Sequence, residues 1–258
     1  MTSDPTSGGP PNRRGKPPAM LRCDRLIELT IADAPSAWSA AGFTVHNHPM
    51  AHRHPFVKVG HVVINLIGGR GGIVSWGFDS SPAHNAEMGF VVDGLATTLV
   101  SARDEERHDI LNPFLEKLER EGKTGHANGV VGIDHVVVFT TNASRTIGMM
   151  AMLGIHPKRP ADDRNGSKFW FFKSGDVVIE LVQVGEATRI ENQDGASFWG
   201  ITFLCHDLDK VVKTGLLKNK PKRAVQGGGR TICTLDHVKA GISTNVAFIT
   251  PRAPNPKL

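Results

Sequence analysis

A repeated seven-residue pattern constrains this chain more than any other feature of its sequence. GHVVINL at residues 60–66 and GDVVIEL at residues 175–181 agree at five of their seven positions. Each segment follows a similar succession of a strand, a helix and further strands. A period of this kind indicates copies of one supersecondary unit, which bury a continuous core by packing on one another. We therefore expect an α+β chain built from tandem modules.

The first copy is predicted to span residues 22–67. A strand is followed by a helix that Asp33 caps and Gly42 ends, because Asp is a favoured helix N-cap and Gly a favoured residue after the last turn. Beyond this copy, IVSWGF at 73–78 predicts one more strand without a clear completion of a second unit.

The second and third copies follow one another directly. In the second, Asn142 caps the predicted helix and Gly154 ends it, and Asp207 begins the helix of the third. The strands predicted for these two copies are the segments 133–141, 168–172, 176–182, 198–205, 224–226, 231–237 and 244–250.

Composition divides the chain into four parts. Residues 1–20, rich in Pro, Gly, Ser and Arg, are predicted to be a disordered tail because they have little apolar surface to bury. Residues 21–100 are predicted to be a degenerate N-terminal module, and residues 127–253 a complete two-module domain. Between them, residues 101–126 are densely charged with apolar residues at helical spacing, which predicts a helical connector.

Bulk properties bound the class of protein. The sequence has no run of about 20 apolar residues, the length that a membrane helix needs. The formal net charge is +5, but much of the excess lies in the tail and in residues 213–223, which lack the recognition elements of a nucleic-acid binder. Cys23, Cys205 and Cys233 show no CxxC spacing and predict reduced thiols. We expect a cytoplasmic protein without nucleic-acid or membrane partners.

Four strings, in their order along the chain, carry a resemblance to a known family. HANGVVGIDHVVV, DVVIELV, FWGITFLCHDLD and AVQGGGRTICTL resemble a glyoxalase-like group of the vicinal oxygen chelate superfamily. IVSWGFD and VVDGLATTLV resemble the first half of that group, in which a partial module precedes a complete two-module domain. The resemblance covers residues 22–100 and 126–252. It implies tandem βαβββ modules that form a cupped mixed sheet, the fold of glyoxalases, bleomycin resistance proteins and dihydroxybiphenyl dioxygenases, with strand order 1-4-3-2 in each module.

His135 and Glu180 stand where members of this superfamily carry metal ligands. Independently of the resemblance, both are polar side chains in apolar strands, where a carboxylate without a partner is costly. Imidazole nitrogen and carboxylate oxygen suit zinc, nickel, manganese or iron. They predict a divalent metal site, with Glu180 as ligand or catalytic base, or otherwise a hydrogen-bonded pair or exposed residues. The equivalent positions of the third copy fall near Gly200 and Ala247, so no four-ligand site is visible.

Other candidate residues flank this pair. In the first copy, Arg25 and Asn65 are assigned to the equivalent positions, where a guanidinium can replace a cation. The histidine-rich segment 46–54 is interpreted as a solvated loop. Arg230, after a glycine run, is a candidate substrate-binding residue on a turn and is expected to point into the cup or into water. Trp199 is a second candidate substrate contact.

Three functions are compatible with these patterns. The preferred one is a small-molecule enzyme of the lyase, isomerase or dioxygenase type, in which a metal at His135 and Glu180 acts as Lewis acid on substrate oxygens. The alternatives are a drug-sequestering protein that binds small molecules without catalysis, and an oligomerisation scaffold. The scaffold reading, including a homodimer, follows from the sheet edges that an incomplete module exposes.

Overall fold

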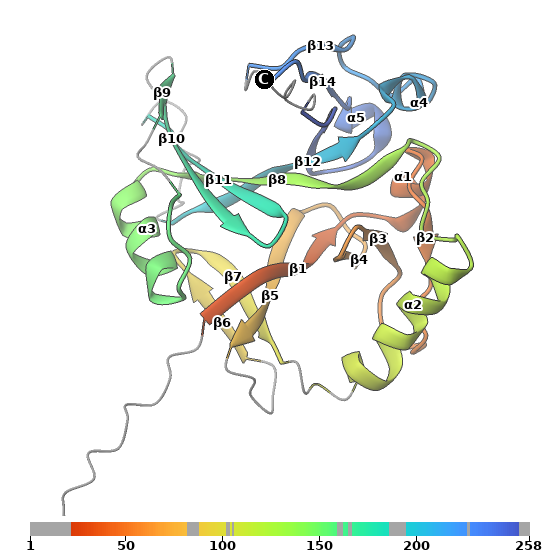
Figure 1. Ribbon diagram of the computed structural model, residues 1–258, viewed down its shortest axis with the longest axis horizontal. Helices are drawn as coiled ribbons and strands as arrows, with labels where there is room; N and C mark the ends of the chain where they lie inside the picture. The colour runs from red at the N-terminus through yellow and green to blue at the C-terminus, as the bar shows by residue number, and fades with distance from the viewer. Residues whose placement is uncertain are drawn as a thin grey trace, which may run out of the picture.

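The computed structural model describes residues 22–81, 88–101, 104, 106–158, 162–164, 167–185, 195–225 and 228–252. Its strands form two curved sheets, drawn in Figure 1. The strand order is β2-β3-β4-β1-β5-β7-β6 in the N-terminal sheet and β13-β14-β15-β12-β8-β11-β10-β9 in the C-terminal sheet. The predicted disordered tail lies outside the described residues.

The N-terminal sheet contains one module and part of another. Its strands are β1 (Arg22–Ala32), β2 (Val45–His46), β3 (Phe56–Val59), β4 (Val62–Leu66), β5 (Gly72–Ser81), β6 (Met88–Val92) and β7 (Leu95–Val100). The first and fourth strands of the module, β1 and β4, are parallel neighbours, as the resemblance implies. Where the sequence predicted a single further strand, the structure has the three strands β5, β6 and β7. The sheet therefore continues on the far side of β1.

Asp33 does not cap the first helix, α1 (Pro35–Ala40), as the sequence predicted. The N-cap is Ala34, which makes no capping hydrogen bond through its side chain. The Asp33 carboxylate is fully buried and accepts hydrogen bonds from the Trp38 indole N–H, at 3.2 Å, and from the backbone N–H of Ser243, at 2.8 Å. Asp33 thereby ties the end of β1 to the loop before β15.

The connector is helical and covers one face of the N-terminal sheet. It consists of a π-helix, η1 (Glu106–Leu111), and an α-helix, α2 (Asn112–Arg120). Leu111, Leu115 and Leu118 form a small buried cluster with Phe56 and Val63 of the sheet. These side chains are the apolar residues at helical spacing that predicted the connector helix. Their burial holds the connector on the sheet.

The C-terminal sheet contains two modules in tandem. Its elements are β8 (Val130–Thr140), α3 (Ala143–Met152), β9 (Asp162–Arg164), β10 (Ser167–Ser174), β11 (Val177–Gln183), β12 (Ser197–Cys205), α4 (Leu208–Val212), β13 (Lys222–Arg223), β14 (Thr231–Thr234), α5 (His237–Ala240) and β15 (Asn245–Ile249). Both modules have the strand order 1-4-3-2, and β8 and β12 meet antiparallel in the middle of the sheet. The chain therefore has tandem βαβββ modules and a cupped mixed sheet.

Local details of these modules agree in part with the sequence. Asn142 caps α3 by accepting a hydrogen bond from the Arg145 N–H, and Asp207 caps α4 by accepting one from the Asp209 N–H, as predicted. The predicted strand 231–237 is wrong at its end, because Asp236 caps a further helix, α5. Among the described residues, no helix is both long and apolar enough to cross a membrane.

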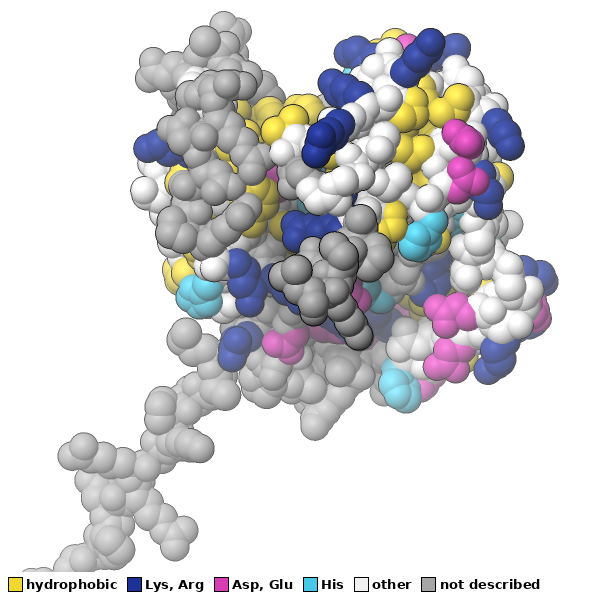
Figure 2. All heavy atoms as spheres, turned by 45° about the horizontal axis from the view of Figure 1, so that its top comes forward, with side chains coloured by type: hydrophobic (Ala, Val, Ile, Leu, Met, Phe, Trp, Pro, Cys, Tyr) yellow, Lys and Arg dark blue, Asp and Glu magenta, His cyan; other side chains and the backbone are white. Residues whose placement is uncertain are grey.

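One hydrophobic core joins the two sheets. It contains buried residues from both halves, including Trp38, Phe43, Phe203 and Phe248, whose rings lie 4.9–6.3 Å apart in the contacts between them. The opposite, concave face of the C-terminal sheet is open, with β9 and β10 rising on one side and β13 and β14 on the other (Figure 1). Figure 2 shows hydrophobic and basic side chains among the described residues on this side of the molecule.

Candidate functional site

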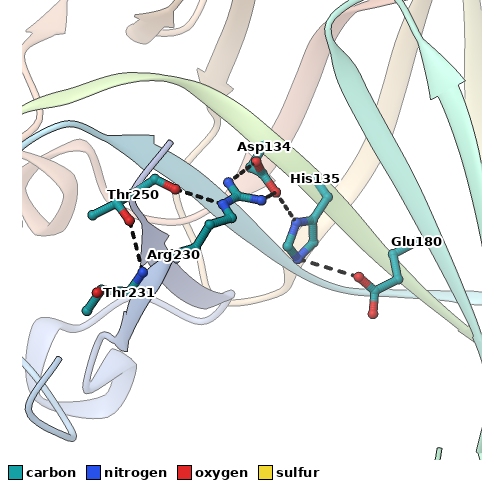
Figure 3. Close-up of polar contacts among 6 residues, drawn as sticks. All are labelled: Asp134, His135, Glu180, Arg230, Thr231 and Thr250. Atoms are coloured by element: carbon teal, nitrogen blue, oxygen red, sulfur yellow. Dashed lines mark hydrogen bonds and ion pairs between the residues drawn. The ribbon is translucent and has the colours of Figure 1, made fainter. Parts of the chain in front are cut away.

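His135 and Glu180 lie on the floor of the C-terminal cup, on neighbouring parallel strands. His135 of β8 is opposite Val178 of β11, and Glu180 of β11 is opposite Val137 of β8. Because alternate residues of a strand share a face, this register puts both side chains on the same face of the sheet. His135 Nε2 lies 3.7 Å from Glu180 Oε2, and the two side chains are only 8 % and 13 % exposed (Figure 3).

A β-bulge brings a third polar side chain to this pair. Opposite β12, His135 pairs with Thr202 and Ile133 pairs with Phe203, which leaves Asp134 without a partner strand residue. A bulge breaks the strict alternation of faces, so neighbouring residues can serve one site. Asp134 Oδ2 accordingly lies 2.8 Å from His135 Nδ1. Strict alternation puts Asp134 and His135 on opposite faces, and for this reason no pattern in the sequence indicated Asp134.

Arg230 completes the chain of contacts and points into the cup, one of the two orientations that the sequence left open. Its guanidinium donates to both carboxylate oxygens of Asp134, and its Nε donates to the Thr250 carbonyl oxygen at 2.7 Å (Figure 3). Only 5 % of Arg230 is exposed. Thr250 also accepts, through its hydroxyl oxygen, a hydrogen bond from the Thr231 N–H at 2.9 Å.

The partners of Asp134 decide its charge. Burial raises the pKa of Asp134, but hydrogen bonds and charge attraction from His135 and Arg230 outweigh it and hold the pKa at about 2. Asp134 is therefore an acceptor, and His135 donates to it through Nδ1. This contact orients the ring so that Nε2 faces Glu180. The 3.7 Å gap is longer than a hydrogen bond, so a bound group can contact both side chains.

Two cavities meet at this pair, and His135 and Glu180 line both of them. The first, of about 540 Å³, is lined by Asp134, His135, Lys158, Phe171, Phe172, Lys173, Val178, Glu180, Arg230 and Arg252. The second, of about 470 Å³, is mainly apolar and includes Trp199, which stacks on Phe139 with ring centroids 5.2 Å apart. All four residues predicted for the site (His135, Glu180, Trp199 and Arg230) therefore line this pair of cavities.

The residues present do not complete a metal site. His135 Nε2 and Glu180 are two potential ligands, but no group of three His, Cys, Asp or Glu side chains arranged for a metal occurs among the described residues. The nearest further carboxylate, Asp134, is held by Arg230 and by the other ring nitrogen of His135. Gly200 and Ala247, on β12 and β15, have no side-chain ligand atoms. The histidine-rich segment 46–54, which forms β2 and the loop to β3, adds no such group.

The predicted correspondence of Arg25 with His135 is wrong, and the strand register gives the reason. Asn65 is opposite Thr30 in the pair β1–β4, as Glu180 is opposite Val137 in the pair β8–β11. Thr30 therefore corresponds to Val137. His135 lies two residues before Val137, so its counterpart is Glu28, two residues before Thr30. Arg25 instead pairs with Asp79 of β5 and is 55 % exposed.

A guanidinium does lie in the N-terminal cup, but the connector supplies it. Asn65 Nδ2 donates to Glu28 Oε1 at 2.7 Å, and Arg107 Nη1 of η1 donates to Glu28 Oε2 at 3.1 Å. The Arg107 side chain is 16 % exposed. The sequence could not place Arg107, because nothing local indicates that the connector folds back onto this face.

Comparisons with known proteins place the fold. No protein-family model matches the chain, and no curated protein matches it in sequence. Among solved structures, 4-hydroxymandelate synthase from Streptomyces coelicolor, as a triple mutant, matches 92 % of this chain and 94 % of its own, with 12 % identity and a TM-score of 0.57. A xylose isomerase-like TIM barrel/4-hydroxyphenylpyruvate dioxygenase fusion protein matches 96 % of this chain at 12 % identity and a TM-score of 0.59. This chain spans about half, 53 %, of the fusion protein.

A third solved structure covers one half of the chain. Methylmalonyl-CoA epimerase from Mycobacterium tuberculosis matches 49 % of this chain and 91 % of its own, with 17 % identity and a TM-score of 0.39. The likeness to the synthase and to the fusion protein extends over nearly the whole of this chain and, at 12 % identity, shows the fold alone. The chain has the fold of the vicinal oxygen chelate superfamily.

Proposed function

We propose that the chain is a small-molecule enzyme of the vicinal oxygen chelate type that transfers protons in its C-terminal cup, with Glu180 as the base. The observation that carries the proposal is the pair of His135 and Glu180, two nearly buried ionisable side chains that face each other where two cavities meet. A carboxylate and an imidazole at this spacing can both reach one substrate group, which is the geometric requirement for acid–base catalysis.

The chemistry follows from the positions of these groups. Glu180 removes a proton from a substrate carbon next to a carbonyl group, and the electron pair of that C–H bond moves toward the carbonyl oxygen. His135, when protonated at Nε2, donates a hydrogen bond to that oxygen, and Asp134 stabilises the charged ring. A proton returned to the opposite face of the carbon gives an epimerisation, and a proton delivered to a neighbouring atom gives an isomerisation. Departure of a neighbouring group with its bonding electron pair gives an elimination.

A metal-dependent reaction is the alternative that the fold suggests. The contact of His135 Nδ1 with Asp134 favours it, because histidine ligands commonly bind a carboxylate through their other nitrogen. Mass spectrometry of protein purified without chelator separates the two. Near-stoichiometric metal that disappears in the double variant His135→Ala with Glu180→Ala would assign a Lewis-acid site to the pair. Metal-free wild type whose activity is insensitive to chelator supports proton transfer by the side chains alone.

Hydrogen exchange in heavy water tests the role of Glu180. The wild type is expected to exchange hydrogen next to the carbonyl group in one or more members of a panel of 2-oxo acids and acyl thioesters, followed by NMR. Glu180→Gln is expected to slow this exchange by about 10²–10⁴-fold, because the amide keeps the shape of the side chain but cannot accept the proton.

The control for this experiment is Asp176→Asn, which removes an exposed carboxylate from the turn between β10 and β11. This variant is expected to exchange at the wild-type rate. Exchange that continues unchanged in Glu180→Gln would contradict the proposal. A wild type that exchanges no member of the panel would favour the binding-protein alternative.

A further inference from the structure

The geometry of the two cavities points to a substrate class: we infer that the cup binds an amphiphilic anion, with a negatively charged group at one end and a flat apolar group at the other. The reacting atom of this molecule lies between its two ends, at His135 and Glu180. The role of that middle atom rests on the proposed function, whereas the two ends are argued from the cavities alone.

The first cavity is a site for a negative charge. Four basic side chains line it, Lys158, Lys173, Arg230 and Arg252, against two acidic ones, Asp134 and Glu180. Asp134 is already paired with Arg230. Among the described residues, no ion pair engages Lys158, Lys173 or Arg252, so their charge is available to a ligand. An anion in a cavity with this excess of positive charge is attracted before contact and held after it.

The basic side chains come from two walls of the cavity. Lys158 lies beside β10, where its backbone N–H donates to the Phe171 carbonyl oxygen, and Lys173 lies on β10 itself. Arg252 follows β15 on the other wall, on the side of Arg230. An anion between these walls is held from opposite directions. Figure 2 shows several Lys and Arg side chains on this side of the molecule.

The second cavity is a site for an apolar group. Phe139, Phe169, Val182, Trp199 and Ile201 line it, together with a few neutral polar side chains. Trp199 is 44 % exposed although it is large and apolar, and one face of its indole stacks on Phe139 at an interplanar angle of 19°. A partly exposed aromatic ring at a cavity wall favours a flat apolar ligand group, which gains stacking as well as burial.

The shared residues fix how such a molecule lies. His135 and Glu180 line both cavities. Suppose that the anionic end of a ligand occupies the first cavity and its apolar end the second. The middle of the ligand then contacts His135 and Glu180.

Binding of three matched probes tests the inference. Calorimetric titrations use 2-naphthoate, 2-naphthyl phosphate and the neutral 2-naphthalenemethanol. The wild type is expected to bind one or both anions at least about tenfold more tightly than the alcohol. The double variant Lys158→Gln with Lys173→Gln is expected to weaken binding of the anions about tenfold and to leave the alcohol within about twofold, because only the charge is removed. Trp199→Ala is expected to weaken all three probes, because they share the naphthalene ring.

The matched control is Lys218→Gln with Lys220→Gln, which removes the same charge from exposed side chains of the loop after α4. It is expected to leave all three affinities unchanged. Equal binding of anions and alcohol, no binding of any probe, or equal losses in the two double variants would overturn the inference. Glu180→Gln separates this result from the proposed function. If Glu180→Gln binds the probes but no longer exchanges hydrogen, the result supports both the substrate class and the role of Glu180 as base. If exchange persists in this variant, Glu180 is not the base, and the inferred substrate class is unaffected.

Discussion

Replacing Arg230 by methionine is expected to lower the free energy of unfolding by about 3–5 kcal/mol, because the change breaks a buried ion pair on one side only. Arg230 is 5 % exposed, and its removal leaves the Asp134 carboxylate with the contact to His135 Nδ1, at 2.8 Å, as its remaining side-chain hydrogen bond among the described residues. It also takes the Nε donor from the Thr250 carbonyl oxygen. Urea unfolding followed by circular dichroism measures the loss.

The pH dependence of the unfolding free energy of Arg230→Met tests the same contact in a second way. In the folded wild type the pKa of Asp134 is about 2, below its ordinary value of 3.8. The stabilisation from this carboxylate is therefore complete above about pH 4 and is lost as the pH falls toward 2. Without Arg230, the pKa of Asp134 is expected to rise, and much of this acid dependence should disappear.

A matched variant shows whether burial is the cause. Arg25→Met breaks another Arg–Asp pair, with Asp79, but Arg25 is 55 % exposed, so a loss of at most about 1 kcal/mol is expected. Equal losses in the two variants would contradict the argument. Arg230→Met combined with Asp134→Leu should regain much of the stability, because no unpaired charge remains buried.

The second large effect is a loss of stability in mild acid that His126 causes. His126 is buried against the N-terminal half of the chain: its Nδ1 accepts a hydrogen bond from the Thr44 N–H at 3.0 Å, and its Nε2 donates to the Lys58 carbonyl oxygen at 3.1 Å. Burial lowers the pKa of His126 from 6.5 to about 4. A protonated ring could no longer accept from Thr44.

The sign of the effect follows from this shift. Because the folded state has the lower pKa, the unfolded chain binds the proton more tightly. The stabilisation from the neutral ring is therefore complete above about pH 6.5 and decreases as the pH falls toward 4, by roughly 3 kcal/mol in all. His46 and His48, whose pKa values burial also lowers, act in the same direction.

Unfolding free energies between pH 4 and 7 measure the contribution of His126. His126→Gln is expected to be less stable at neutral pH and to show a shallower dependence on pH in this range, by about one proton. His156→Gln, which changes an exposed histidine, is expected to keep the wild-type slope. A His126→Gln slope equal to that of the wild type would show that another group takes up the proton.

The order of modules was readable from the sequence, whereas contacts between distant segments were not. The repeat at residues 60–66 and 175–181 and the capping residues Asn142 and Asp207 depend on local pattern, and the structure agrees with them. Asp33 also suits a helix cap by local chemistry. Its carboxylate is instead taken by Ser243, 210 positions away, and a tertiary partner of this kind overrides a local preference.

The same distinction between local pattern and distant contacts applies to the residues of the candidate site. His135 and Glu180 could be named because each is a polar residue within an apolar strand. Asp134 could not, since its orientation depends on an unpaired residue in the ladder with β12. Arg25 was assigned through an alignment of β1 with β8 that the register of β1 with β4 corrects to Glu28. Because side chains alternate between the faces of a strand, an alignment that is wrong by three residues assigns the residue to the opposite face of the sheet.

The ion pair of Arg107 with Glu28 in the N-terminal cup has a consequence for how the chain can be engineered. There the chain itself provides a positive partner for Glu28, and the two residues line a cavity of about 320 Å³. The equivalent pair in the other cup, His135 and Glu180, lines two larger cavities of about 540 and 470 Å³, and its surroundings can gain stability from whatever binds. Substitutions that adapt the chain to a new compound are therefore best placed in the C-terminal cup, where binding can offset a loss of stability.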